Sequence, residues 1–289
     1  MEKEMQKQTV NINWYPGHME KAKRQMQEQL KLVDIIIELR DARMPFSSAN
    51  PLLKSLGQGK PRLIVLTKKD LSDETMTDKW LKVLNEETMT IAINSFDKNA
   101  SNQIVNEVKE ILKTKIERAK ARGIRKKMLR ALVCGIPNVG KSTLINAITK
   151  KKTAKVENRP GVTKSLQWIR IHEDLELLDT PGVLWPKFED QDVAYRLAVL
   201  ASISDRILDK EAITIFGLEY LKNYYPDILE KRYDIKIEDR KAINLIDEIA
   251  LSKKWLKSGG EIDYDKTYDM FLADVRNNNI GKITWDYVE

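Results

Sequence analysis

The stretch Gly135-Ile136-Pro137-Asn138-Val139-Gly140-Lys141-Ser142 decides the fold of this chain. It follows the apolar run 131–134 and leads into a second apolar segment, 143–148, which indicates a loop between a strand and a helix. The spacing is G-x-x-x-x-G-K-[ST], in which glycines let the backbone approach phosphate groups and successive N–H groups attract negative charge. An ordinary glycine turn is the alternative, but the full spacing in this context predicts a nucleotide phosphate site.

Individual residues of this loop carry separate tasks. We expect Lys141 to reach the outer phosphates and to act in catalysis, and Ser142 to hold Mg²⁺. We assign the phosphate contacts to six consecutive residues: Asn138, Val139, Gly140, Lys141, Ser142 and Thr143.

The composition limits the class of protein. The 289 residues are 42% hydrophobic and carry 50 Lys+Arg against 43 Asp+Glu, a net charge of +7 that suits a polyanionic partner or plain solubility. The single cysteine, Cys134, lies in an apolar run and predicts a small buried side chain, and no disulfide framework or Cys/His zinc cluster can form. No apolar run approaches the ~20 residues that span a bilayer. We therefore expect a cytoplasmic protein without a membrane partner.

Three short apolar runs precede the phosphate loop, over 32–39, 63–66 and 89–93, with helical patterns around 50–56 and 77–84. Strands that alternate with helices predict a parallel sheet, whose ligands collect at the carboxyl ends of the strands. Polar residues follow each run, so we place the candidate site at that edge.

A helical pattern over 102–121 runs into a strongly basic segment. Residues 113–130 contain nine Lys or Arg and one acidic residue, Glu117. A solvated helix face and a contact with a phosphate backbone both explain this charge, and the sequence leaves the two open.

Downstream of the phosphate loop, a turn over 159–163 precedes strands at 166–171 and 175–178. The second strand ends in Asp179-Thr180-Pro181-Gly182, where Asp179 is expected to complete the Mg²⁺ site and Gly182 to donate its N–H to the γ-phosphate. The remainder predicts helices over 191–203, 209–225, 239–256 and 265–277, and a short strand over 282–288.

Two elements upstream of the phosphate loop predict recognition of guanine. Thr67-Lys68-Lys69-Asp70 resembles the Asn/Thr-Lys-x-Asp element of GTPases, in which the Asp carboxylate accepts from both guanine N1–H and the exocyclic amine. Asn94-Ser95, one strand later, resembles the next guanine-loop element. A charged turn is the alternative for 67–70. The guanine elements precede the phosphate loop, which reverses the order found in ordinary GTPases.

With this order, the chain resembles the circularly permuted GTPases, and specifically the YlqF/RbgA family of bacterial ribosome biogenesis GTPases. The resemblance covers nearly the whole chain and rests on 14–19, 41–45, 67–70, 135–143, 159–163 and 179–186. It implies an α/β fold: a circularly permuted P-loop GTPase domain, with a mostly parallel sheet and helices on both faces, plus a C-terminal mainly helical domain. We expect an N-terminal segment at 1–30, the GTPase domain at 31–186 and the helical domain at 187–289.

The resemblance also implies residue roles. Many GTPases have a water-orienting glutamine after the D-x-x-G glycine, but this chain has Val183, and the family offers His18 as the substitute. Thr163, together with Ser142 and Asp179, is expected to bind Mg²⁺ and to respond to the γ-phosphate. Asn138 is expected to hold K⁺, although an asparagine that only stabilises the loop is the alternative.

The implied function is hydrolysis of GTP to GDP and phosphate by an assembly factor for the large (50S) ribosomal subunit. The factor would bind rRNA and ribosomal proteins of the precursor particle in its GTP state and leave on hydrolysis. We expect a monomer that is slow alone and stimulated by the particle. Two alternatives stay open: an RNA-binding nucleotide switch with negligible turnover, and a P-loop phosphotransferase acting on a small substrate.

Overall fold

The structure is a computed structural model that describes residues 24, 27–51, 53, 57, 59–124, 127–149, 167–179, 190–203, 209–238 and 240–289. The predicted catalytic residue His18 and the predicted Mg²⁺ ligand Thr163 lie outside these residues, as does Gly182. For Asp179, only the backbone is described.

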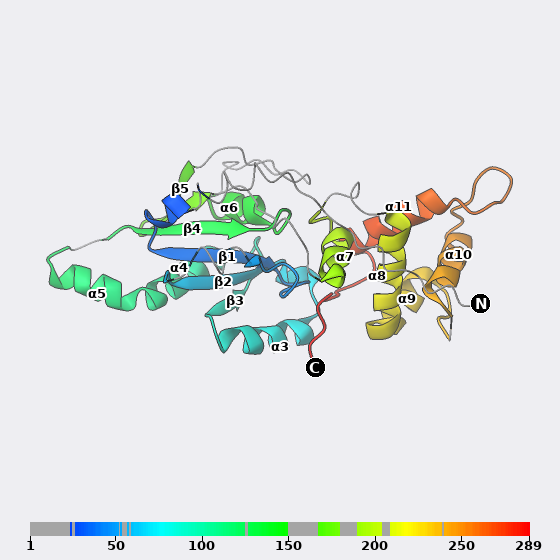
Figure 1. The fold of residues 1–289 in the computed structure, drawn as a ribbon, viewed down its shortest axis with the longest axis horizontal. Helices are drawn as coiled ribbons and strands as arrows, with labels where there is room; N and C mark the ends of the chain where they lie inside the picture. Colours follow the sequence, from blue (N-terminus) through cyan, green and yellow to red (C-terminus); the bar gives the residue numbers. More distant parts are fainter. Residues whose placement is uncertain are drawn as a thin grey trace.

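One six-stranded sheet, in the order β3-β2-β1-β4-β6-β5, forms the body of the N-terminal part (Figure 1). Its strands are β1 Ile35–Asp41, β2 Arg62–Thr67, β3 Thr90–Ala92, β4 Leu129–Gly135, β5 Gln167–His172 and β6 Leu175–Asp179. All neighbouring strands are parallel except β5, which pairs antiparallel with β6. The expected mostly parallel sheet is confirmed.

Helices cover both faces of the sheet because its central strands are apolar on both sides. Ile37 of β1 belongs to the large core formed with α4 (Ala100–Ile111) and α6 (Lys141–Thr149), whereas its neighbour Ile36 packs with Cys134 in a separate cluster. A third cluster, around Ile64, packs against α3 (Glu74–Asn85). Cys134 is 1% exposed, and burial raises the pKa of its thiol, as expected for a packing residue.

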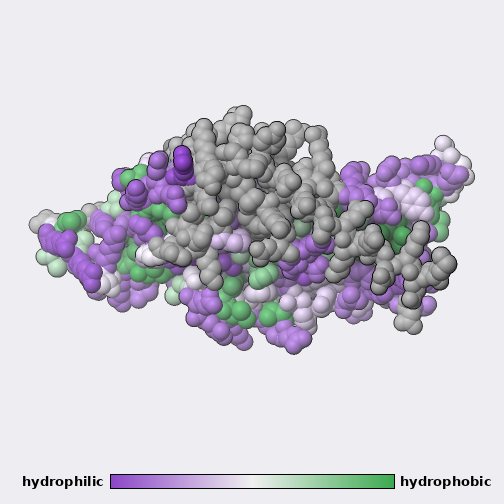
Figure 2. Space-filling model, viewed as in Figure 1, coloured by the Kyte–Doolittle hydropathy of each residue, from purple (hydrophilic) through white to green (hydrophobic). Residues whose placement is uncertain are grey.

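Helix α5 (Lys113–Ala121) projects beyond the sheet at the end of the molecule opposite to the helical region (Figure 1). The predicted helix over 102–121 is thus two helices, α4 and α5, separated at Leu112. The surface over α5 is predominantly hydrophilic (Figure 2).

The C-terminal part of the chain is helical, as expected. Its helices are α7 Gln191–Val199, α8 Lys210–Tyr224, α9 Pro226–Tyr233, α10 Ala242–Ser252 and α11 Tyr264–Arg276. Helix α9 was not predicted, because a proline after Tyr225 is typical of a break between helices. Pro226 instead occupies the first turn of α9, where the missing N–H costs no intrahelical hydrogen bond.

The predicted strand over 282–288 is wrong, since the structure has no strand in this described segment. Residues 283–286 are all buried, so they lack the alternation of buried and exposed side chains that is typical of a strand covered on one face. They pack against the end of the sheet and against α3: the Trp285 N–H donates to the Arg43 carbonyl at 2.5 Å, and the Trp80 indole N–H donates to the Asp286 carbonyl at 2.8 Å. The C-terminal tail therefore joins the helical region to the sheet.

Within the part of the chain that the structure describes, none of the helices combines the length and the apolar character needed to cross a membrane.

Candidate nucleotide-binding site

The loops after β1, β2 and β4 lie at one edge of the sheet, because these strands are parallel neighbours. Thr67, the last residue of β2, is in register with Asp41, the last residue of β1. The phosphate loop follows β4 directly and ends at Lys141, the first residue of α6. The chain thus brings the predicted phosphate and guanine elements to the same edge.

The phosphate loop has the backbone that its glycines predict. A Cβ at Gly135 would lie 2.7 Å from the Leu39 carbonyl oxygen, so a larger residue would displace the loop from β1. Gly140 has a φ of +95°, in the region that side chains rarely adopt. Ser142 and Thr143 follow Lys141 in the first turn of α6, where free backbone N–H groups attract anions. This arrangement fits the phosphates of a nucleotide.

The guanine loop is hydrogen-bonded to the phosphate loop. The Thr67 hydroxyl donates to the Val139 carbonyl at 2.5 Å, and the Lys68 ammonium donates to the Asn138 carbonyl at 2.6 Å. These partners are 72 and 70 residues apart in the sequence. Because the two loops are tied together, a nucleotide held by one is positioned for the other. The phosphate motif and the predicted guanine motif are therefore in direct contact.

Asp41 stabilises this junction between the guanine loop and the phosphate loop. Its carboxylate is fully buried and accepts from the Lys68 ammonium at 2.7 Å and from the Arg43 guanidinium at 2.8 and 3.0 Å. Burial raises the pKa of Asp41, but the two cations outweigh it and hold the pKa well below its ordinary value. Sequence reasoning used Asp41 and Arg43 only as family markers and did not foresee this role. The sequence feature that could have predicted this role is the pair of opposite charges, Asp41 and Arg43, directly at the end of a buried strand.

The remaining guanine residues lie beside this junction. Asp70 is exposed in the short helix η1 (Lys69–Leu71), so its carboxylate is open to a ligand. The Lys69 backbone N–H donates to the Ile93 carbonyl at 3.2 Å, which joins the loop to the end of β3. Asn94 follows there and accepts from the Phe96 N–H at 3.0 Å, while Ser95 is buried. The structure thus places 67–70 next to 94–95.

The side chain of Asn138 contacts the helical region. Its amide nitrogen donates to the Ala201 carbonyl at 2.6 Å, in the turn after α7. Both residues have a positive φ, 60° at Asn138 and 55° at Ala201. Since the amide nitrogen is a donor, only the side-chain oxygen of Asn138 could serve as the predicted K⁺ ligand.

The backbone of Asp179 ends β6 and is in register with Val133 of β4, the strand that leads into the phosphate loop. This register agrees with the expected position of a Mg²⁺ ligand. Since Thr163 lies outside the described residues, the metal site as a whole stays a prediction.

His172, the last residue of β5, caps the turn between β5 and β6. Its Nδ1 accepts from the Asp174 N–H at 3.2 Å.

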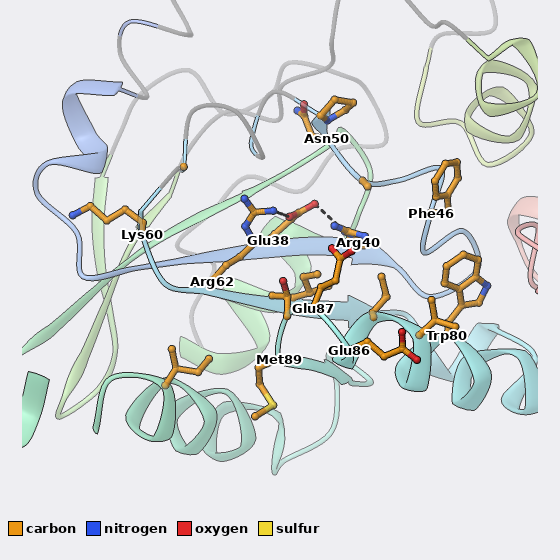
Figure 3. Close-up of a pocket in the computed structure, with 18 of the residues that line it drawn as sticks. Glu38, Arg40, Phe46, Asn50, Lys60, Arg62, Trp80, Glu86, Glu87 and Met89 are labelled. Atoms are coloured by element: carbon orange, nitrogen blue, oxygen red, sulfur yellow. Dashed lines mark hydrogen bonds and ion pairs between the residues drawn. The ribbon is translucent and has the colours of Figure 1, made fainter. Parts of the chain in front are cut away.

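A pocket of about 910 Å³ lies on another part of the sheet and shares no residue with the predicted nucleotide set (Figure 3). Glu38 lies at its floor, 1% exposed, between the guanidinium groups of Arg40 at 2.8 Å and Arg62 at 3.2 Å. Trp80 and Met89 line its other side. The lining holds three cations, Arg40, Lys60 and Arg62, and three carboxylates, Glu38, Glu86 and Glu87, so it has no excess of positive charge and does not resemble a phosphate site.

Comparisons with known proteins agree with this geometry. Residues 130–254 match the family described as "50S ribosome-binding GTPase". The chain is 45% identical over 281 residues to the ribosome biogenesis GTPase A of Bacillus pumilus, covering 97% of this chain and 100% of that protein. It is 31% identical over 278 residues to a probable ribosome biogenesis GTPase A of Mycoplasma genitalium, covering 96% of this chain and 97% of the relative.

Solved structures of similar fold include two of YlqF. The GDP-bound form matches with a TM-score of 0.64 and 24% identity, covering 91% of this chain and 98% of that one. The GNP-bound form from T. maritima matches with a TM-score of 0.61, also at 24% identity, covering 92% and 97%. The predicted fold and the predicted family are confirmed: this chain belongs to the ribosome biogenesis GTPase A family.

Proposed function

We propose that this GTPase acts on a precursor of the large ribosomal subunit, binding it in the GTP state and leaving when GTP is hydrolysed. The 2.6 Å hydrogen bond from Lys68 to the Asn138 carbonyl, which joins the predicted guanine loop to the phosphate loop, supports the nucleotide part of the proposal, and the names of the relatives support the ribosomal part. Relatives that match almost the full chain are named for ribosome biogenesis. We further propose a monomer that works in the cytoplasm.

Each residue of the site has a proposed task. Lys141 binds the outer phosphates, and Ser142, Thr163 and Asp179 hold Mg²⁺, which neutralises phosphate charge when bound. Asp70, exposed beside the loop junction, accepts from guanine. His18 positions the attacking water, and K⁺ at Asn138 adds positive charge near the phosphates. Gly182 donates its N–H to the γ-phosphate.

The nucleotide state has a proposed route to the helical domain, which we place at 187–289. The 179–182 segment leads towards that domain in the sequence, and Asn138 of the phosphate loop contacts its Ala201 directly. We expect the domains to change their relative orientation between GDP and a non-hydrolysable GTP analogue. Identical small-angle scattering curves in the two states would contradict this.

The test of the function is GTP hydrolysis in K⁺ buffer, measured with and without large ribosomal subunits and their precursors. We expect strong stimulation by the particle with GTP and none with ATP. A Na⁺ buffer of equal ionic strength tests the K⁺ site. Tight GTP binding without stimulated turnover would favour the RNA-binding switch, and equal use of ATP would favour a phosphotransferase.

Two variants test the residue assignments in the same assay. Asp70→Asn replaces an acceptor with a donor, so it should lose preference for GTP and gain preference for xanthosine triphosphate, whose carbonyl replaces the exocyclic amine. His18→Ala should keep GTP binding but lose particle-stimulated hydrolysis. Full stimulated activity in His18→Ala would remove His18 from the catalytic assignment.

A further inference from the structure

Positive charge is distributed unequally along the chain. Residues 1–186 contain 34 Lys+Arg and 22 Asp+Glu, whereas residues 187–289 contain 16 and 21. The helical part is therefore net acidic, and the excess of positive charge belongs to the part that includes the sheet. A polyanion is attracted mainly to that part.

Several cations converge on the amino-terminal end of β1, at the sheet edge opposite to the nucleotide loops. The Lys60 ammonium donates to the Val33 carbonyl at 2.7 Å, and Lys115 pairs with Asp34 at 2.6 Å. Lys127 lies 3.8 Å from the same Asp34 carboxylate, which also accepts from the backbone N–H of Arg130 at 3.0 Å. Asp34 thus faces two ammonium groups, and Glu176 lies 3.5 Å from the Arg130 guanidinium. Four cations face two carboxylates, so positive charge remains at this edge.

Helix α5 extends the same charge into solvent. Ala119 is its one buried residue, so the helix contributes little to the core. Among the residues that the structure describes, Arg118, Lys120 and Arg122 have no acidic partner within salt-bridge distance, and all three are exposed. Their side chains can reach phosphate groups without breaking an existing ion pair.

An aromatic side chain borders these cations. Trp168 of β5 is 39% exposed, and the Arg130 guanidinium lies 4.9 Å from its ring centroid. Arginine on an exposed aromatic ring offers both charge and a flat face, a combination that nucleic-acid-binding surfaces use. Protein interfaces, in contrast, are depleted of lysine.

We infer that this surface, which we call the basic end, binds the phosphate backbone of RNA. The basic end consists of Lys60, Lys115, Arg118, Lys120, Arg122, Lys127, Arg130 and Trp168. The inference rests on the proposed function for the source of the RNA, which would be the ribosomal particle. Since the lysines and arginines of the basic end lie at the edge of the sheet opposite to the nucleotide loops, its affinity for RNA should be equal with GDP and with a GTP analogue.

The experiment measures binding of a fluorescein-labelled RNA duplex of about 20 base pairs, a little longer than the ~16 that a duplex-binding module covers. The test variant is Arg118→Glu/Lys120→Glu/Arg122→Glu. The matched control is Lys254→Glu/Lys257→Glu/Lys266→Glu, which makes the same charge change at exposed positions of the helical region. We expect the affinity for the labelled RNA to fall at least roughly tenfold in the test variant and less than about threefold in the control.

Salt dependence sharpens the result. If three phosphate contacts are lost, the slope of log affinity against log salt concentration should become less negative by about 2–3 in the test variant. The neutral variant Arg118→Gln/Lys120→Gln/Arg122→Gln should lie between wild type and the charge reversal. Equal losses in test and control variants would show a net-charge effect and overturn the inference, as would unchanged RNA affinity in the test variant.

GDP affinity and unstimulated GTP hydrolysis, measured on the same preparations, separate this inference from the proposed function. Both should be unchanged in test and control variants, because the altered residues lie outside the nucleotide site. Failure of the wild-type protein to bind GTP would remove the proposed function, and loss of RNA binding in the test variant alone would still locate the RNA surface.

Discussion

The two edges of the sheet use the same charged residue types in different ways. At the carboxyl edge, Asp41 is fully buried and holds Arg43 and Lys68, which is itself bonded to the phosphate loop. At the amino edge, Asp34 keeps 14% of its side-chain surface and Lys115 keeps 46%. Buried charges must remain paired, and exposed pairs can exchange partners at little cost. Burial therefore makes the charged side chains of the carboxyl edge a rigid support, whereas those of the amino edge can exchange partners and bind phosphate groups.

The largest expected effect is the loss of the buried carboxylate. Asp41→Ala leaves Arg43 and Lys68 without their compensating charge, so we expect it to lower the free energy of unfolding by about 3–5 kcal/mol. Urea denaturation measures this. The control Asp78→Ala removes an exposed carboxylate on α3 and should change stability by less than about 0.5 kcal/mol. A loss below about 1 kcal/mol in Asp41→Ala would contradict the rigid-support role.

The same carboxylate predicts a pH dependence. The pKa of Asp41 is lowered in the folded protein, whereas in the unfolded chain it is about 3.9. Between those two values the unfolded chain binds more protons, so this contribution to stability is complete above about pH 4 and is lost as the pH falls through the folded pKa. The stability difference between wild type and Asp41→Ala should therefore shrink below about pH 4. A difference that grows on acidification would have the wrong sign.

The docked C-terminal tail should give the next largest effect. Asp286 is 3% exposed and accepts from the backbone N–H groups of Phe46 and Ser47, each at 2.8 Å. Asp286→Ala leaves the N–H and the hydroxyl of the buried Ser47 without their acceptor, which should cost about 2–3 kcal/mol in urea denaturation. Glu289→Ala, at an exposed position of the same segment, is the control. Equal stability of the two variants would show that the tail is not held through Asp286.

The smallest effects belong to the amino edge. Lys115→Ala removes a half-exposed ion pair and should lower stability by about 0.2–1 kcal/mol. Arg118→Ala removes an exposed cation of α5 and should change stability by less than about 0.5 kcal/mol. If thermal or urea unfolding showed Arg118→Ala to be as costly as Asp41→Ala, the contrast between the two edges would not hold.

Local sequence patterns determined much of this protein. The apolar runs predicted all six strands, and the spacing of Gly135, Gly140 and Lys141 predicted the loop between β4 and α6. These features depend on neighbouring residues, since strand patterns and glycine turns are encoded over a few positions. The order of the guanine and phosphate elements, together with the other motif stretches from 14–19 to 179–186, carried the resemblance to the permuted GTPases and to the family.

Other features required the folded chain, because their partners are distant in sequence. The contact of Asn138 with Ala201 joins residues 63 apart, and that of Ser47 with Asp286 joins residues 239 apart. Asp41 likewise gained its role only when β1 and β2 aligned side by side and brought Lys68 to its carboxylate. No local periodicity encodes such pairings. They form because a buried charge or N–H group must find a partner wherever tertiary packing places it.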